Sequence, residues 1–326
     1  GFGGGYVVAA SAIKQEFPEH WGAASDWQSR DRAWALAVIS ERTPILASGA
    51  VRRLVTAVRN ELTRESPLLP AGLTAERLRQ PVRLRPVSGL TRDDVDLRTL
   101  DSLVDPQESE AFIWDPMRAP WKSVGIVAGP GMGKSWLLAY HASSIAQSML
   151  DSLDRGVLQE SEVAIPIYLE AARFARTLPE VPIERDVVSA LASATHRLFP
   201  GGVDMEEADT LITLALASSR IRLCVDGLDE VPSELRRRLI AGLALLEPRV
   251  DQLVVSTRDS ARQVLTEVFP RGFEEFAITG FTTGDVRRFV EAWHQSSPGS
   301  VETVRQLVRS GRQTRSLSRV PLLLGF

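Results

Sequence analysis

The sequence predicts an α/β fold built on a parallel sheet of five strands, with helices covering both faces. Five short apolar or β-branched runs alternate with longer stretches that carry apolar residues at helical spacing, such as residues 235–246. Alternation of strands and helices at this length is typical of parallel sheets, because each connection must cross the sheet before the next strand begins. The predicted strands are residues 124–128, 163–169, 221–225, 253–256 and 276–279.

The composition narrows the classes of protein to consider. Of 326 residues, 44% are hydrophobic and 24% are charged, which is the balance of a soluble globular protein. A formal charge of −3 argues against bulk electrostatic attraction to nucleic acid or to anionic lipid. No apolar run reaches the roughly 18 residues that a membrane-spanning helix needs. The single cysteine, Cys224, cannot form an internal disulfide, which favours a reducing, cytoplasmic setting.

Four regions are expected along the chain, and the absence of an initial methionine indicates an excerpt of a longer protein. The first is a mostly helical effector or adapter region, in which Leu54, Val55, Val58 and Leu62 share one helical face. The second is a connector rich in proline and arginine, with short extended pieces such as residues 82–86. The third is the α/β unit, and the fourth begins a helical subdomain. The four regions are residues 1–65, 66–115, 116–281 and 282–326.

A glycine-rich segment follows the first predicted strand of the α/β unit and matches a phosphate-binding P-loop. Its glycines let the backbone wrap around phosphate oxygens, and the amides at the start of the next helix point toward the anion. Lys134 is expected to reach the β- and γ-phosphates, and Ser135 to offer its hydroxyl to Mg²⁺. The strict motif has glycine at position 128, where this chain has Ala128. The predicted loop comprises Gly129, Pro130, Gly131, Met132, Gly133, Lys134 and Ser135.

Acidic residues follow the third predicted strand, where a P-loop needs a carboxylate for its metal. Asp226 ends the apolar run, so we expect it at the carboxyl edge of the sheet as a Mg²⁺ ligand. Asp229 and Glu230 lie three and four positions later and are both candidates to orient or deprotonate the attacking water. Glu230 is slightly favoured, and the choice between the two stays open.

An arginine follows the fourth predicted strand. Because this strand is expected between the two strands that carry the motifs, Thr257 and Arg258 should approach the γ-phosphate. Arg258 is therefore a candidate catalytic residue that reports whether the γ-phosphate is present.

Together these residues resemble the NACHT NTPases, which belong to the STAND class of signal-transduction ATPases. The resemblance spans residues 115–326 and is most specific in the Asp-Gly-x-Asp-Glu signature at 226–230. It includes the glycine-rich loop and the Ser-Thr-Arg motif at 256–258. A proline-containing second strand at 163–169 and a Gly-Phe step at 280–281 agree with the family pattern.

The resemblance implies a molecular switch that uses ATP or ADP with Mg²⁺. ADP would hold a closed monomer, and sensing of an unknown trigger ligand would permit exchange for ATP and assembly into a homo-oligomer. Hydrolysis would be slow and regulatory, in prokaryotic defence or signalling. Pro321 matches a family proline that packs on adenine, although Arg319 replaces the glycine of the related pattern. Trp136 is another candidate for the adenine, with a place in the core as the simpler interpretation.

Two other functions use the same kind of site. A motor or transport ATPase would carry an arginine finger or a Leu-Ser-Gly-Gly-Gln signature, and no such signature is present. A non-hydrolysing, nucleotide-dependent scaffold would bind ATP and never release phosphate. A GTPase is disfavoured, because its Asn-Lys-x-Asp motif is impossible when Asn60 is the only asparagine.

Overall fold

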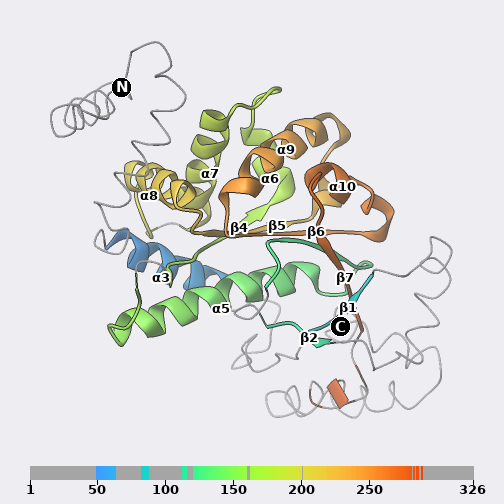
Figure 1. The fold of residues 1–326 in the computed structure, drawn as a ribbon, viewed down its shortest axis with the longest axis horizontal. Coiled ribbons are helices and arrows are strands. Elements are labelled where there is room, and N and C mark those ends of the chain that lie inside the picture. The colour runs from blue at the N-terminus through green and yellow to red at the C-terminus, as the bar shows by residue number, and fades with distance from the viewer. Residues whose placement is uncertain are drawn as a thin grey trace, which may run out of the picture.

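The computed structural model has an α/β fold in which a seven-stranded mixed sheet is covered by helices (Figure 1). It describes residues 49–63, 82–87, 112–115, 120–159, 162–199, 201–280, 282, 284, 285 and 288. The strands are β1 (Arg83–Pro86), β2 (Phe112–Ile113), β3 (Ser123–Val127), β4 (Ile165–Glu170), β5 (Ile221–Asp226), β6 (Gln252–Thr257) and β7 (Glu274–Ile278). The helices are α3 (Ala50–Leu62), α5 (Lys134–Asp154), α6 (Ala171–Thr177), α7 (Glu184–Leu198), α8 (Met205–Ala217), α9 (Ser233–Leu246) and α10 (Val264–Val268). Three short 3₁₀ turns are η4 (Leu228–Glu230), η5 (Glu247–Arg249) and η6 (Asp259–Ala261).

The sheet order is β2-β1-β7-β3-β6-β5-β4. All five predicted strands are present, and they pair in parallel from β7 to β4. As expected, β6 lies between the strand that precedes the glycine-rich loop and the strand that ends in Asp226.

The expectation of a purely parallel sheet of five strands was wrong. Two further strands extend the sheet beyond β7: β1 pairs with β7 in antiparallel orientation, and β2 pairs with β1 in antiparallel orientation. Both come from the proline- and arginine-rich stretch, and β1 falls within the extended piece expected at residues 82–86. Their four and two residues are too short to show a strand period, so pairing of β1 with β7 and of β2 with β1 decides their conformation.

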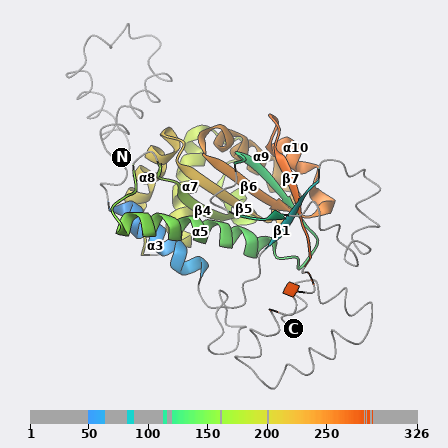
Figure 2. The same cartoon turned by 60° about the horizontal axis from the view of Figure 1, so that its bottom comes forward.

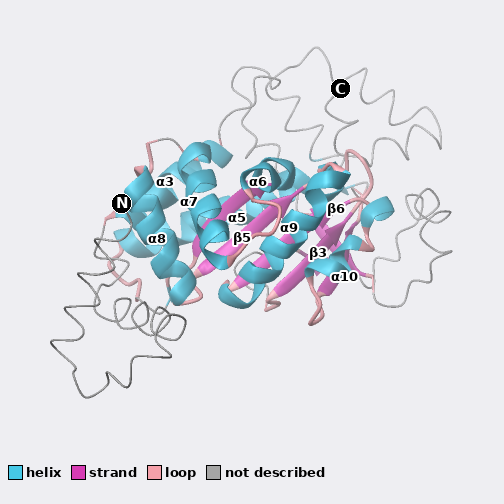
Figure 3. Cartoon of the chain, turned by 90° about the horizontal axis from the view of Figure 1, so that it is seen from above, coloured by secondary structure: helices cyan, strands magenta, loops and turns pink. Residues whose placement is uncertain are grey.

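Helices lie on both faces of the sheet. In Figure 1, α5 and α3 run below the sheet, and α6, α7, α9 and α10 cover it from above. Figure 2 shows α5 crossing in front of the strands with α3 beside it, and Figure 3 shows the opposite layer of helices over the strands. No helix in the described part of the chain is long and apolar enough to cross a membrane.

Helix α3 packs directly on α5, the helix that begins at Lys134. Its residues Leu54, Val55 and Val58 are fully buried in the largest hydrophobic cluster of the α/β unit. Gly202 approaches it so closely that a Cβ there would lie 2.9 Å from the Cβ of Ala57. The predicted helix of the N-terminal region therefore shares the α/β core, while residues 1–48 lie outside the described part of the chain.

A buried chain of hydrogen bonds joins α5 to the start of β6. Trp114 donates from Nε1 to His141 Nδ1 (3.0 Å), so His141 carries its proton on Nε2 and donates it to Gln252 Oε1 (2.9 Å). Gln252 in turn donates from Nε2 to the carbonyl of Trp121 (2.8 Å). Burial lowers the pKa of His141 to about 4, so this side chain is neutral at physiological pH. His141 therefore has a structural role in the core.

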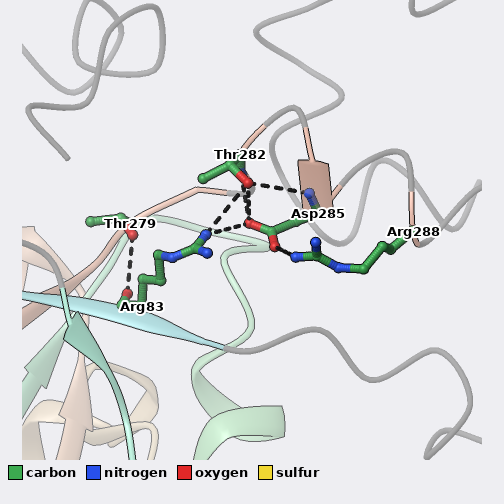
Figure 4. Close-up of polar contacts among 5 residues, drawn as sticks. All are labelled: Arg83, Thr279, Thr282, Asp285 and Arg288. Carbon is green, nitrogen blue, oxygen red and sulfur yellow. Dashed lines mark hydrogen bonds and ion pairs between the residues drawn. The ribbon is translucent and has the colours of Figure 1, made fainter.

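The segment after β7 is tied to β1 through Asp285 (Figure 4). Asp285 is 1% exposed, and its Oδ2 accepts from Arg83 Nη1 (2.7 Å) and from the Thr282 amide (2.8 Å). The Asp285 amide donates back to Thr282 Oγ1 (3.2 Å), which is the reciprocal pattern of a helix capping box. Arg288 pairs with the second carboxylate oxygen from the other side.

Replacing Asp285 with alanine should lower the free energy of unfolding by about 2–3 kcal/mol, as expected for loss of a charged hydrogen bond. Arg288→Ala is the matched control, because Arg288 is 53% exposed and its loss should cost less than about 1 kcal/mol. Urea denaturation of both variants measures the difference. Equal costs for the two substitutions would show that the pair with Arg83 contributes nothing.

His141 should make folding stability depend on pH. The folded pKa of about 4 lies below the unfolded value of 6.5, so the unfolded chain binds a proton first as pH falls. The contribution is complete above pH 6.5 and declines as pH falls through the interval, and the total loss is about 3 kcal/mol once the pH is below the folded pKa of about 4. His141→Gln, which stays neutral, should flatten this part of the stability–pH profile in thermal denaturation. Parallel profiles for the two proteins would contradict the prediction.

Candidate functional site

The glycine-rich loop lies between β3 and the start of α5. Gly131 and Gly133 have positive φ values of 73° and 90°, which side chains with a Cβ rarely adopt. Ala128 departs from the strict motif without strain. Its amide donates to the carbonyl of Thr257 (3.3 Å), which continues the pairing of β3 with β6. Among the described residues, Ser219 is the single non-glycine residue with positive φ, so Ala128 has an ordinary backbone conformation.

The Lys134 ammonium lies inside this loop. Its Nζ donates to the carbonyls of Ala128 (2.9 Å) and Gly129 (3.2 Å). Burial lowers the pKa of Lys134, and the Asp229 carboxylate is the largest of the influences that oppose this shift. The loop therefore holds a partly desolvated positive charge at the N-terminus of α5, which is the chemistry needed to bind an anion.

Asp226 is oriented by hydrogen bonds from both neighbouring strands. Ser256 on β6 donates to its Oδ1 (2.6 Å), and Tyr168 on β4 donates to its Oδ2 (3.0 Å). The amide of Gly227 donates to Ser256 Oγ (2.9 Å), so the serine links the strand end to the carboxylate. Burial, followed by the nearby Asp226 charge, raises the pKa of Tyr168 and keeps its hydroxyl protonated as a donor.

Sequence reasoning assigned no role to Tyr168 or to the hydroxyl of Ser256. A tyrosine in an apolar run resembles an ordinary strand residue, since aromatic side chains are enriched in strands. The usable signal was their position: both lie near the carboxyl ends of strands that flank Asp226 in the parallel order.

Asp229 and Glu230 leave β5 through the short turn η4, and their side chains have different environments. Asp229 is 9% exposed and forms an ion pair between its Oδ2 and Arg258 Nε (2.8 Å). Glu230 is exposed, and its carboxyl carbon lies 3.2 Å from where a Cβ on Gly227 would be. Gly227 has a φ of 76°, so only a residue without a Cβ readily allows this turn. The two candidate bases are thus clearly distinguished by burial and by partner.

Two buried polar atoms at this edge have no hydrogen-bond partner among the described residues. They are Asp229 Oδ1 and Thr257 Oγ1. Buried polar atoms are nearly always paired in folded proteins, and exceptions often mark functional sites. Both atoms belong to the group of residues that sequence analysis placed near the γ-phosphate.

A magnesium ion would fit the oxygen groups of Ser135 and Asp226. Ser135 is exposed on the first turn of α5, and the Asp226 carboxylate is already oriented by two hydroxyl donors. Hard cations such as Mg²⁺ accept one or two carboxylates together with water and phosphate oxygens. Within the described ranges no cluster of three or more His, Cys, Asp or Glu side chains offers a complete protein-only metal site.

The remaining predicted residues are less closely tied to this edge. Trp136 stacks on Tyr140 along α5, with ring centroids 5.4 Å apart. Met132 packs against the smaller hydrophobic cluster, and Pro130 is exposed at the tip of the loop. Pro321, predicted to contact adenine, lies outside the described residues.

The comparisons with known proteins do not assign the chain to a family. No protein-family model matches it, and no curated protein is significantly similar to it.

Removing the Ser256 hydroxyl should lower stability more than removing the Tyr168 hydroxyl. Ser256→Ala leaves the buried Gly227 amide without its acceptor, which should cost about 1–3 kcal/mol. Tyr168→Phe removes one of two donors to a partly exposed carboxylate, and the expected cost is below about 1 kcal/mol. Chemical denaturation of the two variants measures the order, and a larger loss for Tyr168→Phe would contradict the link through Ser256.

Proposed function

We propose that this chain is the nucleotide-binding part of a switch ATPase of the NACHT type, within the STAND class. The observation that supports it best is the group formed by Lys134, Asp226 and the Asp229–Arg258 pair. These residues follow three adjacent parallel strands, β3, β5 and β6, whose carboxyl ends share one edge of the sheet. The charges of Asp226, Asp229 and Arg258 all affect the pKa of the Lys134 ammonium. Ligands of open α/β sheets bind at this edge.

Each group has a role in holding a nucleoside triphosphate. Backbone amides at 129–135 and the Lys134 ammonium bind the phosphates, with Gly131 and Gly133 allowing the loop to curve. Ser135 and Asp226 hold Mg²⁺, which neutralises charge on the phosphates when it is bound. Arg258 contacts the γ-phosphate, and an acidic residue of η4 orients the attacking water.

The packing of α3 supports a switch over a simple hydrolase. Because α5 begins at Lys134 and α3 packs along it, a shift of the loop would reach α3 through this contact. In this proposal, ADP stabilises a closed state, and a trigger ligand permits ATP binding and assembly with further copies of the chain. Hydrolysis is slow and resets the switch.

Replacing Lys134 with alanine should weaken binding of ATP by about 100-fold, as expected for loss of a charged contact to phosphate. Isothermal titration of the purified chain with Mg²⁺-ATP measures this loss. Lys122→Ala is the matched control: Lys122 is exposed, donates to the carbonyl of Pro248 (3.2 Å), and should leave the affinity unchanged.

The rate of ATP turnover then distinguishes the switch from the two alternative functions. Slow phosphate release that depends on Lys134 supports the switch. Rapid, untriggered turnover would favour a motor or transport ATPase, and tight binding without any phosphate release would favour a scaffold. Equal affinities of the two lysine variants and the unchanged chain for ATP would show that Lys134 does not bind the phosphates, and they would contradict the proposed nucleotide site.

A further inference from the structure

Asp229 interacts electrostatically with Lys134 and Arg258, the two cations that bind the γ-phosphate in the proposed site. Its Oδ2 pairs with Arg258 Nε at 2.8 Å. It is also the strongest electrostatic attraction on the Lys134 ammonium, ahead of Asp226 and Asp259. A single carboxylate is therefore paired with one of these cations and attracts the other.

The Asp229 side chain is held more firmly than its partner. It is 9% exposed and lies on a turn whose preceding residue, Leu228, is fully buried. Arg258 is 45% exposed and has a long side chain, so it can change partners with little rearrangement of the fold. Because the Arg258 partner is about half exposed, a phosphate can reach the guanidinium and compete for it.

The second carboxylate oxygen of Asp229 is buried and has no hydrogen-bond partner among the described residues. This position suits a counter-ion for cations better than a base for water, because the buried oxygen is closed to solvent and the other is engaged by Arg258. Glu230 differs in both respects, since it is exposed and folds over Gly227.

We propose that Asp229 is an internal substitute for the γ-phosphate. It holds Arg258 when the site carries a diphosphate or no nucleotide, and it releases Arg258 when a triphosphate arrives. The exchange makes the site discriminate ATP from ADP, and it leaves Glu230 as the residue that orients water. This inference rests on the proposed function, because it requires that the site bind nucleotides.

A double-mutant cycle tests the exchange. Dissociation constants for ADP and for a non-hydrolysable ATP analogue are measured by calorimetry for the unchanged chain, Asp229→Asn, Arg258→Gln and the double variant. Asp229→Asn frees Arg258 and should tighten binding of the ATP analogue by about five-fold, while the affinity for ADP changes by less than about two-fold. Arg258→Gln should weaken binding of the ATP analogue. Adding Asp229→Asn to this variant should raise its affinity for the analogue by less than about two-fold.

Asp259→Asn is the matched control for loss of a negative charge, because Asp259 also attracts Lys134 but more weakly. Asp259→Asn should not tighten binding of the ATP analogue relative to that of ADP. Arg258→Lys retains the positive charge and provides a second test if Arg258→Gln lowers the melting temperature.

Other results would overturn the inference. If Asp229→Asn tightens the analogue equally with and without Arg258, general charge repulsion explains the gain. If Asp229→Asn stops hydrolysis while Glu230→Gln does not, Asp229 is the base. Binding of neither nucleotide by the unchanged chain would instead refute the proposed function, and the inference with it.

Discussion

The parallel pairing of β3, β6 and β5 is the constraint on which the candidate site depends. In a parallel sheet all strands point the same way, so residues that follow them gather at one edge. The pairing of Val127 with Thr257 and of Val225 with Val255 sets how far each strand extends. The loop at 129–135, Asp226 and Arg258, which are far apart in the sequence, are thereby brought to the same edge.

This constraint explains why much of the site could be predicted. Strands β3, β5 and β6, which carry the candidate site, are mostly buried and appear in the sequence as apolar runs. Once their direction is known, the residues after each run must meet at one edge. This step alone is enough to predict that the loop at 129–135, Asp226 and Arg258 lie at the same edge.

The parts that sequence reasoning missed depend on tertiary partners. Strands β1 and β2 carry little periodicity and are defined by the pairing of β1 with β7 and of β2 with β1. Tyr168 and Ser256 carry side chains that are common in strands, and only the lateral strand order shows that both donate to Asp226. The choice between Asp229 and Glu230 could not be made from the sequence, because adjacent residues on a tight turn acquire different burial only after folding.

The two ends of β6 show how polar groups are used differently within one element. At its start, Gln252 belongs to a buried chain in which Trp114 and His141 also have partners, so this end is fixed. At its other end, Thr257 Oγ1 and the neighbouring Asp229 Oδ1 are buried without partners among the described residues. A satisfied polar network favours one arrangement, whereas an incomplete one favours binding of a group that completes it. The same strand therefore anchors the sheet at one end and, at the other, leaves the Thr257 hydroxyl available to donate a hydrogen bond to a ligand.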